Sequence, residues 1–153
     1  MTPPLYRSSA TPGFSVFVAR HPRRVMARKL VQQIDVRFAT EPCRLKTREG
    51  EVHAHPGDAI ITGIAGEHWR VSRARFGEKY RAVPPTVTGE PGRYESLPNE
   101  IIAVPMSESF EVLLADGISR LHGEPGDWLV DYGDGSLGIV SPDIFASTYR
   151  LTN

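Results

Sequence analysis

Three histidines form the group of side chains with the clearest chemical potential in this sequence. His53 and His55 are separated by one residue, and His68 follows Glu67. Alternate residues of a strand point to the same face of a sheet, so the first two can present their imidazoles to one metal ion, as a facial metal site requires. His53, His55 and His68 are therefore the candidate metal ligands.

The phrase His-Ala-His-Pro-Gly-Asp at residues 53–58 resembles the first metal motif of cupins. The resemblance implies a metal-binding protein or a metal-dependent enzyme. Two features weigh against it. Asp58 is the only carboxylate near the position where that motif has a glutamate, and the spacing from Gly66 to His68 is one residue shorter than in the second cupin motif. Histidines at the surface or in turns are the alternative interpretation.

Arginines beside a tryptophan form the second candidate site. Arg70, Arg73 and Arg75 closely follow Trp69, and the segment Arg20–Lys29 adds a further basic cluster. Guanidinium groups bind phosphate, and an aromatic ring can stack on a nucleic-acid base. Trp69 and the three arginines are therefore the candidate ligand-binding residues. The alternative is that these arginines pair with the acidic half of the chain, residues 82–153.

No residue is assigned a catalytic role, and no cofactor is expected. Cys43 is the only cysteine, which excludes an internal disulfide and fits a reducing compartment. It is expected in a loop, without the helix N-terminus or histidine that would lower the pKa of its thiol. The run from Asp131 to Gly135 has the composition of a tight hairpin turn and lacks the ligand spacing of a calcium loop.

Composition excludes several broad classes of protein. The chain has 153 residues, of which 40% are hydrophobic and 24% charged, and its formal net charge is zero. This balance argues against a chain built wholly to bind nucleic acid. No apolar run approaches the roughly 18 residues that a membrane-spanning helix needs. Phe14–Ala19 precedes the basic cluster, which is the reverse of a signal peptide, so a cytoplasmic location is expected.

The charges are unevenly distributed along the chain. Residues 1–81 contain 15 Lys and Arg against 7 Asp and Glu, whereas residues 82–153 contain 3 against 11. The balance is therefore +8 in the first part and −8 in the second. It is compatible with a basic face for an anionic partner, with self-association through the oppositely charged halves, or with two solvated surfaces.

An internal repeat shows which elements must position these residues. Residues 56–81 align without a gap on residues 125–150, with 9 identities in 26 positions. The identical residues are Pro-Gly-Asp at 56–58 and 125–127, Gly66 and Gly135, Val-Ser at 71–72 and 140–141, Phe76 and Phe145, and Tyr-Arg at 80–81 and 149–150. Upstream, Ile34–Phe38 is matched to Ile102–Met106, with two residues inserted in the second copy.

The shared residues have structural roles. Pro-Gly favours a type II turn, and the following aspartate can bind nearby backbone N–H groups. An apolar strand, a glycine turn and a return strand, His68–Val71 or Leu137–Val140, complete a hairpin. Ser72 and Ser141 are predicted helix N-caps. In each copy a phenylalanine and a tyrosine four residues apart are expected to face the sheet from the following helix.

The sequence therefore predicts an α+β protein, predominantly β, with two small β-rich modules related by approximate two-fold symmetry. Each module consists of hairpin strands followed by a short helix. An N-terminal extension, residues 1–29, contains the basic segment and an expected edge strand at Phe14–Ala19. The modules span residues 30–82 and 99–153, and a Pro-rich linker, residues 83–98, joins them.

The phrases Pro125–Val130 and Val140–Tyr149 resemble the PGDYG-motif family of bacterial and phage proteins, which is present here as two tandem copies. The resemblance implies no established activity, so no catalytic residue is carried over to this chain. The first copy departs from the pattern at Arg73, where the second copy has Pro142.

Three hypotheses of function follow. The first is a non-enzymatic binding or interaction module built from a duplicated domain, whose partner the sequence does not identify. The second is the cupin-like metal-binding protein or enzyme that uses His53, His55 and His68, although Glu124 and Leu137 stand in place of the last two in the second copy. The third is a binder of nucleic acid or of a phospholigand through the module 1 arginines.

Overall fold

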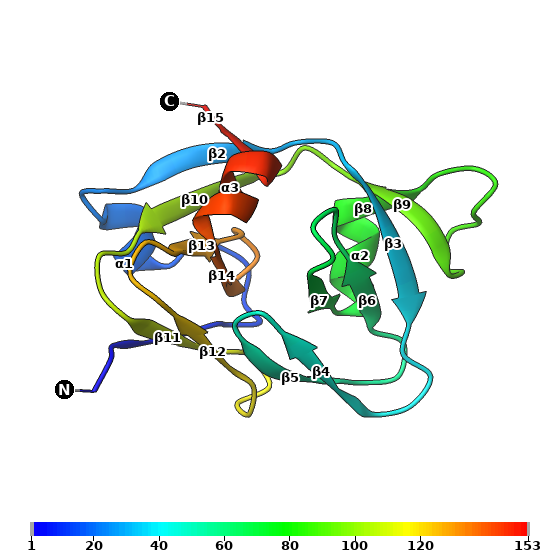
Figure 1. Cartoon of the computed structure of the whole chain (residues 1–153), viewed down its shortest axis with the longest axis horizontal. Helices are drawn as coiled ribbons and strands as arrows, with labels where there is room; N and C mark the ends of the chain where they lie inside the picture. Colours follow the sequence, from blue (N-terminus) through cyan, green and yellow to red (C-terminus); the bar gives the residue numbers. More distant parts are fainter. Residues whose placement is uncertain (1, 153) are drawn as a thin grey trace. The chain divides into compact units, whose positions relative to one another are not determined.

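The chain folds into two compact units that are rich in β-structure (Figure 1). The structure is a computed structural model that describes residues 2–152. Unit 1 comprises Met1–Lys29 and Glu100–Asn153, and unit 2 comprises Leu30–Asn99. The predicted β-rich class is confirmed, with 44% of residues in strands and 13% in helices. No helix within residues 2–152 is long and apolar enough to cross a membrane.

Unit 2 is a five-stranded sheet with one helix and a separate two-stranded hairpin. The strand order in the sheet is β7-β6-β3-β9-β8, and β4 and β5 form the hairpin. The elements are β3 (Gln33–Phe38), β4 (Cys43–Thr47), β5 (Gly50–Ala54), β6 (Ala59–Thr62), β7 (His68–Val71), α2 (Arg73–Lys79), β8 (Tyr80–Ala82) and β9 (Gly92–Ser96).

Unit 1 has a five-stranded sheet of its own, together with a three-stranded sheet and two helices. The larger sheet has the order β14-β13-β10-β2-β15 and the smaller one the order β1-β11-β12. The elements are β1 (Leu5–Arg7), α1 (Val16–Arg20), β2 (Val25–Lys29), β10 (Glu100–Pro105), β11 (Phe110–Leu113), β12 (Arg120–Gly123), β13 (Trp128–Asp131), β14 (Leu137–Val140), α3 (Pro142–Thr148) and β15 (Tyr149–Leu151).

The Pro-Gly-Asp phrase forms the same turn in both units. Asp58 N donates to His55 O at 3.0 Å, and Asp127 N donates to Glu124 O at 3.0 Å. The glycines between them have φ values of +92° and +98°, which suit the third position of a type II turn. Each aspartate Oδ2 also accepts the backbone N–H of the first turn residue, at 2.8 and 2.9 Å. The predicted turn and its carboxylate clasp are confirmed.

Each aligned stretch then forms strand, turn, strand and helix, as predicted. The aromatic pairs pack where they were expected, with Phe76 and Tyr80 each 5% exposed, Phe145 5% and Tyr149 8%. Ser72 and Ser141 occupy the N-cap positions, but neither side chain accepts a capping hydrogen bond. Packing of the aromatic residues against the sheet therefore stabilises these short helices more than capping does.

The two larger sheets share the order of corresponding strands and their register. On β3, Val36 lies opposite Ile61 of β6, and on β10, Ala103 lies opposite Val130 of β13. Ile61 and Val130 are matched positions of the aligned stretches, so Val36 corresponds to Ala103. This places the counterpart of every β3 residue on β10.

The register corrects the upstream match by one residue. Ile34–Phe38 corresponds to Ile101–Pro105 and not to Ile102–Met106. Such a shift moves each side chain to the other face of the sheet. The sequence pattern could not show this, because β10 is buried on both faces and its alternation is lost. The two inserted residues lie in the turn between β11 and β12.

The chain passes between the units twice. It leaves unit 1 after β2, forms all of unit 2, and returns at β10, which pairs with β2. The two ends of unit 2 are held side by side by Ser96, which is 1% exposed. Its Oγ donates to Leu30 O at 2.9 Å, and its backbone N–H donates to Gln32 O at 3.0 Å.

Two segments differ from the domain organisation expected from the sequence. The expected linker, residues 83–98, contains β9, whose Tyr94 is 1% exposed in the core of unit 2. The expected extension, residues 1–29, contains β2, the strand of unit 1 that carries the buried Ala27. The prolines on both sides of β9 make its segment resemble a linker in the sequence. The basic residues around Ala27 likewise interrupt the apolar pattern that would indicate β2.

The expected edge strand at Phe14–Ala19 is wrong. Val16–Arg20 forms α1, because the Ser15 side chain accepts the backbone N–H of Val18 at 3.1 Å and caps the helix. The edge strand of this segment is instead β1, Leu5–Arg7, which pairs with β11 in parallel.

Candidate functional site

The candidate metal ligands do not form a common site in the structure. His68 lies exposed on β7, with Nδ1 3.1 Å from Thr62 Oγ1. His55 follows β5, with Nδ1 3.6 Å from Asp58 Oδ2, and His53 lies within β5. Within residues 2–152, no group of three His, Cys, Asp or Glu side chains is arranged to hold a metal ion.

The candidate ligand-binding residues lie on different faces of unit 2. Trp69 packs with the aromatic core between the sheet and α2. Arg70 is the next residue of β7, and its Nη1 lies 3.1 Å from Asp58 Oδ2 on the opposite face. Arg73 and Arg75 belong to α2. Trp69 and Arg70 therefore point away from each other, and the four residues do not converge on one ligand.

Arg70 has a structural role, and it pairs with Asp58 of its own half of the chain rather than with the acidic half as the alternative interpretation expected. Asp58 is 7% exposed and accepts both the Arg70 guanidinium and the backbone N–H of His55. The pair joins the Pro-Gly-Asp turn to β7. In unit 1 the counterpart of Arg70 is Ile139, so the pair is specific to unit 2.

Cys43 begins β4 and is not part of a loop as expected. It is exposed and lies opposite Ala54 of β5.

The charge separation along the chain does not become a charge separation between the units. Unit 1 contains 8 Lys and Arg against 9 Asp and Glu, and unit 2 contains 10 against 9. The basic N-terminal segment belongs to the same unit as the acidic end of the chain, and Arg28 Nη2 lies 2.8 Å from Glu100 Oε1. Self-association through oppositely charged halves stays a prediction.

In unit 1, the face of the large sheet that is turned away from α3 is apolar and covered. α1 contacts β10 on this sheet, and β11 and β12 contact β14. Five apolar side chains of the sheet face this cover, none of them more than 8% exposed: Ile102, Val104, Leu129, Leu137 and Ile139. The N-terminal segment therefore completes a second core layer in unit 1.

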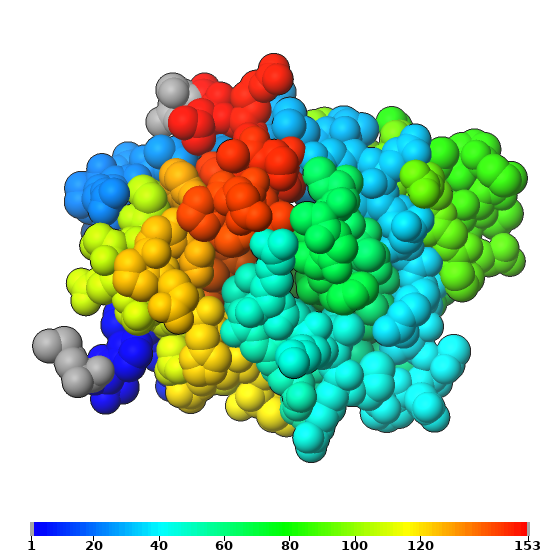
Figure 2. All heavy atoms as spheres, in the orientation of Figure 1, coloured from blue at the N-terminus to red at the C-terminus, as the bar shows by residue number. Residues whose placement is uncertain are grey.

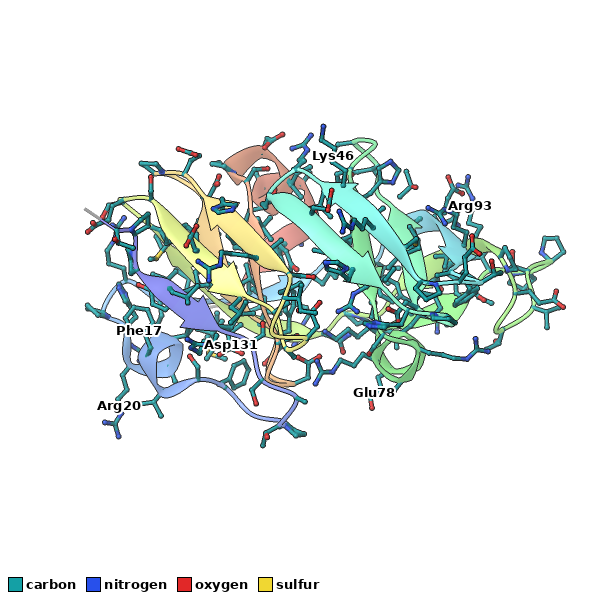
Figure 3. All side chains as sticks on the ribbon, turned by 90° about the horizontal axis from the view of Figure 1, so that it is seen from below. Phe17, Arg20, Lys46, Glu78, Arg93 and Asp131 are labelled. Atoms are coloured by element: carbon teal, nitrogen blue, oxygen red, sulfur yellow. The ribbon has the colours of Figure 1, made fainter. Side chains whose placement is uncertain are left out.

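Asp131 ties this cover to the sheet. It is fully buried, and its Oδ2 accepts the backbone N–H of Ser15, at the start of α1, at 2.6 Å. Its Oδ1 accepts the N–H of Gly133 at 3.0 Å. Burial, which disfavours the charged form, raises the pKa of Asp131, and the two backbone donors oppose that effect. Figure 3 labels Asp131 together with Phe17 and Arg20 of α1.

In unit 2, the corresponding sheet face is polar; β4 contacts β7 at one edge of the sheet, and the part of the face over β3 is open. Asp35 and Arg37 of β3 are exposed there, where β10 of unit 1 has Ile102 and Val104. Thr62 stands in place of Asp131. A hollow of about 140 Å³ opens on this face. Its lining consists of Asp35, Val36, Arg37, Ile60 and Thr62.

Unit 2 has no element that corresponds to α1 or β1 within Leu30–Asn99. The odd-numbered positions of β3, Gln33, Asp35 and Arg37, are polar in the sequence, as in any strand with one solvated face. Nothing in the sequence was a reason to expect a binding site on that face. Only the register of the two sheets shows that the equivalent face of unit 1 is covered. The open face of unit 2, defined by Asp35, Arg37, Ile60 and Thr62, is the candidate functional site; the side chain of Val36, between the first two, belongs to the core on the α2 side.

Comparison with known proteins identifies a family but no individual relative. The family model described as "PGDYG protein" matches residues 50–150, which include both Pro-Gly-Asp turns. No curated protein and no solved structure matches the chain. The match covers about two thirds of the sequence, and the chain belongs to the PGDYG protein family.

Proposed function

We propose that this protein is a non-enzymatic binding module that holds its partner on the open face of unit 2. One observation carries the proposal. The same sheet face is apolar and covered by the N-terminal segment in unit 1, but polar and hollowed in unit 2. Polar residues at the surface with an apolar base beneath them are typical of interaction sites.

The chemistry of the hollow indicates what such a partner would present. Ile60, which is 2% exposed, supplies an apolar base. Asp35 and Arg37 flank it with opposite charges, and Arg93 of β9 lies 3.4 Å from Asp35. The volume of about 140 Å³ suits one apolar side chain. The expected ligand is therefore a segment with one aliphatic residue and polar neighbours.

The two units are proposed to be tandem copies of one module, which accounts for the contrast between them. This proposal is supported by the strand order and the register that the two large sheets have in common, and by the matching Pro-Gly-Asp turns. In this view one copy uses its sheet face for the protein's own N-terminal segment. The other copy keeps the face available for a partner.

The test is selection of short random peptides, displayed on phage, against the immobilised full-length protein. Binding of the selected peptides to Arg37→Glu is expected to weaken about tenfold or more, because a charge beside the hollow is reversed. Glu78→Arg, an equally exposed charge reversal on α2, is the control and should leave binding unchanged. Failure to select any peptide, or equal binding to both variants, would overturn the proposal.

A further inference from the structure

In unit 1, a strand from the N-terminal segment adds to the edge of a hairpin. β1 joins the edge of the β11–β12 hairpin in parallel, with Tyr6 opposite Val112. The Glu111 N–H donates to Pro4 O at 2.9 Å, and Leu113 O accepts the Ser8 N–H at 2.8 Å. Two backbone hydrogen bonds at the ends of β1 thus fix its register on this edge.

The β4–β5 hairpin occupies the corresponding place in unit 2. Both hairpins follow the central strand of their sheet and lead into the Pro-Gly-Asp turn. The register of the sheets makes Leu45 the counterpart of Val112, and these residues are 8% and 0% exposed. Within the described chain, β4 pairs with β5 alone and contacts β7 without pairing to it, so no strand is hydrogen-bonded to its other edge.

The backbone groups at this edge correspond to those that bind β1. The counterpart of Glu111 is Arg44, and that of Leu113 is Lys46. The N–H of Arg44 and the C=O of Lys46 are therefore oriented for an added parallel strand. Such an edge is a template for an extended peptide, because it offers unsatisfied backbone donors and acceptors.

The side chains of β4 select the kind of peptide. Leu45 is buried, whereas Arg44 and Lys46 are exposed on the other side of the strand. Arg44 Nη1 lies 3.6 Å from Glu51 Oε1 of β5, an exposed ion pair of the weak kind that leaves both cations accessible to a partner. Figure 2 shows the hairpin in cyan at the surface, and Figure 3 shows Lys46 extending outward from it. Opposite charges on neighbouring strands attract, so acidic residues are favoured beside these two cations. A second copy of β1 is disfavoured because it carries Arg7.

We propose that the free edge of β4 binds an extended acidic peptide segment as a parallel strand. The segment places acidic residues beside Arg44 and Lys46 and an apolar residue beside Leu45. This inference rests on the proposed function and specifies the chemistry of the partner.

The geometry of unit 1 connects this edge to the hollow. β1 leads to α1, and Ser15 at the start of α1 binds Asp131. The counterpart of Asp131 is Thr62, which lines the hollow of unit 2. A partner that follows the same course continues from β4 onto the open face. There an apolar residue takes the place that Val18, 1% exposed, has in unit 1.

The probe is an acetylated, fluorescently labelled peptide with the core Ser-Glu-Leu-Glu-Ser. Aligned like β1, its glutamates lie opposite Arg44 and Lys46 and its leucine opposite Leu45. The second serine then takes the position of Ser8. Binding to the full-length protein is measured by fluorescence anisotropy. The matched control peptide has lysine in place of both glutamates.

Two kinds of variant separate charge from strand pairing. The double change Arg44→Glu and Lys46→Glu is expected to weaken binding of the glutamate peptide about tenfold or more and to confer binding of the lysine peptide. Arg44→Pro removes the backbone N–H that the added strand needs and spares the bonds from β4 to β5. It should weaken binding by a similar factor. A peptide N-methylated at the second serine gives the same test without altering the protein.

Equal binding of the glutamate peptide to the wild type and the charge-reversed variant would overturn the inference. So would full binding of the N-methylated peptide, or displacement of the probe by a single-stranded oligonucleotide, since both indicate attraction to charge without strand pairing. If phage-selected peptides bind the hollow while the glutamate peptide does not bind, the edge proposal fails and the proposed function stands. If neither binds, both fail.

Discussion

Phe145→Ala offers a direct measure of how α3 is held in unit 1. Phe145 is 5% exposed and is stacked on Trp128, with ring centroids 4.0 Å apart and an interplanar angle of 9°. It also stacks on Tyr149 at 5.1 Å. Truncation of a buried phenylalanine to alanine costs about 3–5 kcal/mol. Loss of two ring contacts, each of about 0.5–1.5 kcal/mol, places the expected cost in the upper part of that range.

The protein carries one tryptophan in each unit, which makes the assay specific. With Trp69→Phe as background, Trp128 reports urea unfolding of unit 1 at the site of the change. For an m-value of about 2 kcal/mol/M, a loss of about 4 kcal/mol lowers the midpoint by about 2 M. Ile118→Ala, also in unit 1, removes aliphatic atoms at a site that is 67% exposed and should change stability by less than about 0.5 kcal/mol. A loss below about 1 kcal/mol at unchanged m-value would refute the packing of α3 described here.

Three further changes test other parts of the structure. Gly135 and Gly66 both have positive φ, but a Cβ at Gly135 would meet the backbone of the N-terminal segment, whereas a Cβ at Gly66 would meet open space. Gly135→Ala should therefore lower the thermal unfolding temperature clearly more than Gly66→Ala does. Arg70→Ile should cost about 1–3 kcal/mol in urea unfolding, because it leaves the Asp58 carboxylate buried without its cation. The raised pKa of Asp131 means that its contribution is present below the ordinary aspartate pKa and is lost as pH rises through the folded value. The stability of the wild type relative to Asp131→Asn should therefore fall as the pH is raised above the ordinary aspartate pKa of 3.8, and a difference independent of pH would contradict this.

Local chemistry made much of the hairpin and helix structure predictable. The Pro-Gly-Asp turn, the return strands and the burial of Phe76 and Phe145 follow from interactions within a few residues of one another, and the sequence carries them twice. Ser15 shows the limit of such reasoning. An apolar pattern after it favoured a strand, but its side chain caps a short helix whose Val18 is buried against the body of unit 1.

Long-range pairing was not predictable from the sequence. β9 lies in a proline-rich segment, yet it pairs with β3, more than 50 residues earlier in the chain, with Tyr94 opposite Ile34. The open face of unit 2 was also not predictable from the sequence. Exposed polar residues on β3 are typical of any half-buried sheet, and only the register with β10 reveals that unit 1 covers the equivalent face.

The clasp at Ser96 has a consequence for the order in which the molecule folds. β2 and β10 are adjacent in their sheet but are separated by the 70 residues of unit 2. Closing a flexible loop of that length costs about 4 kcal/mol of chain entropy. Once unit 2 has folded, the hydrogen bonds of Ser96 hold the first and last residues of unit 2 together. The end of β2 and the start of β10 are then close in space, as they would be in a short hairpin. We therefore expect unit 2 to fold before unit 1. Both sheet neighbours of β2, which are β10 and β15, follow unit 2 in the chain, so β2 has no partner strand until β10 has been synthesised.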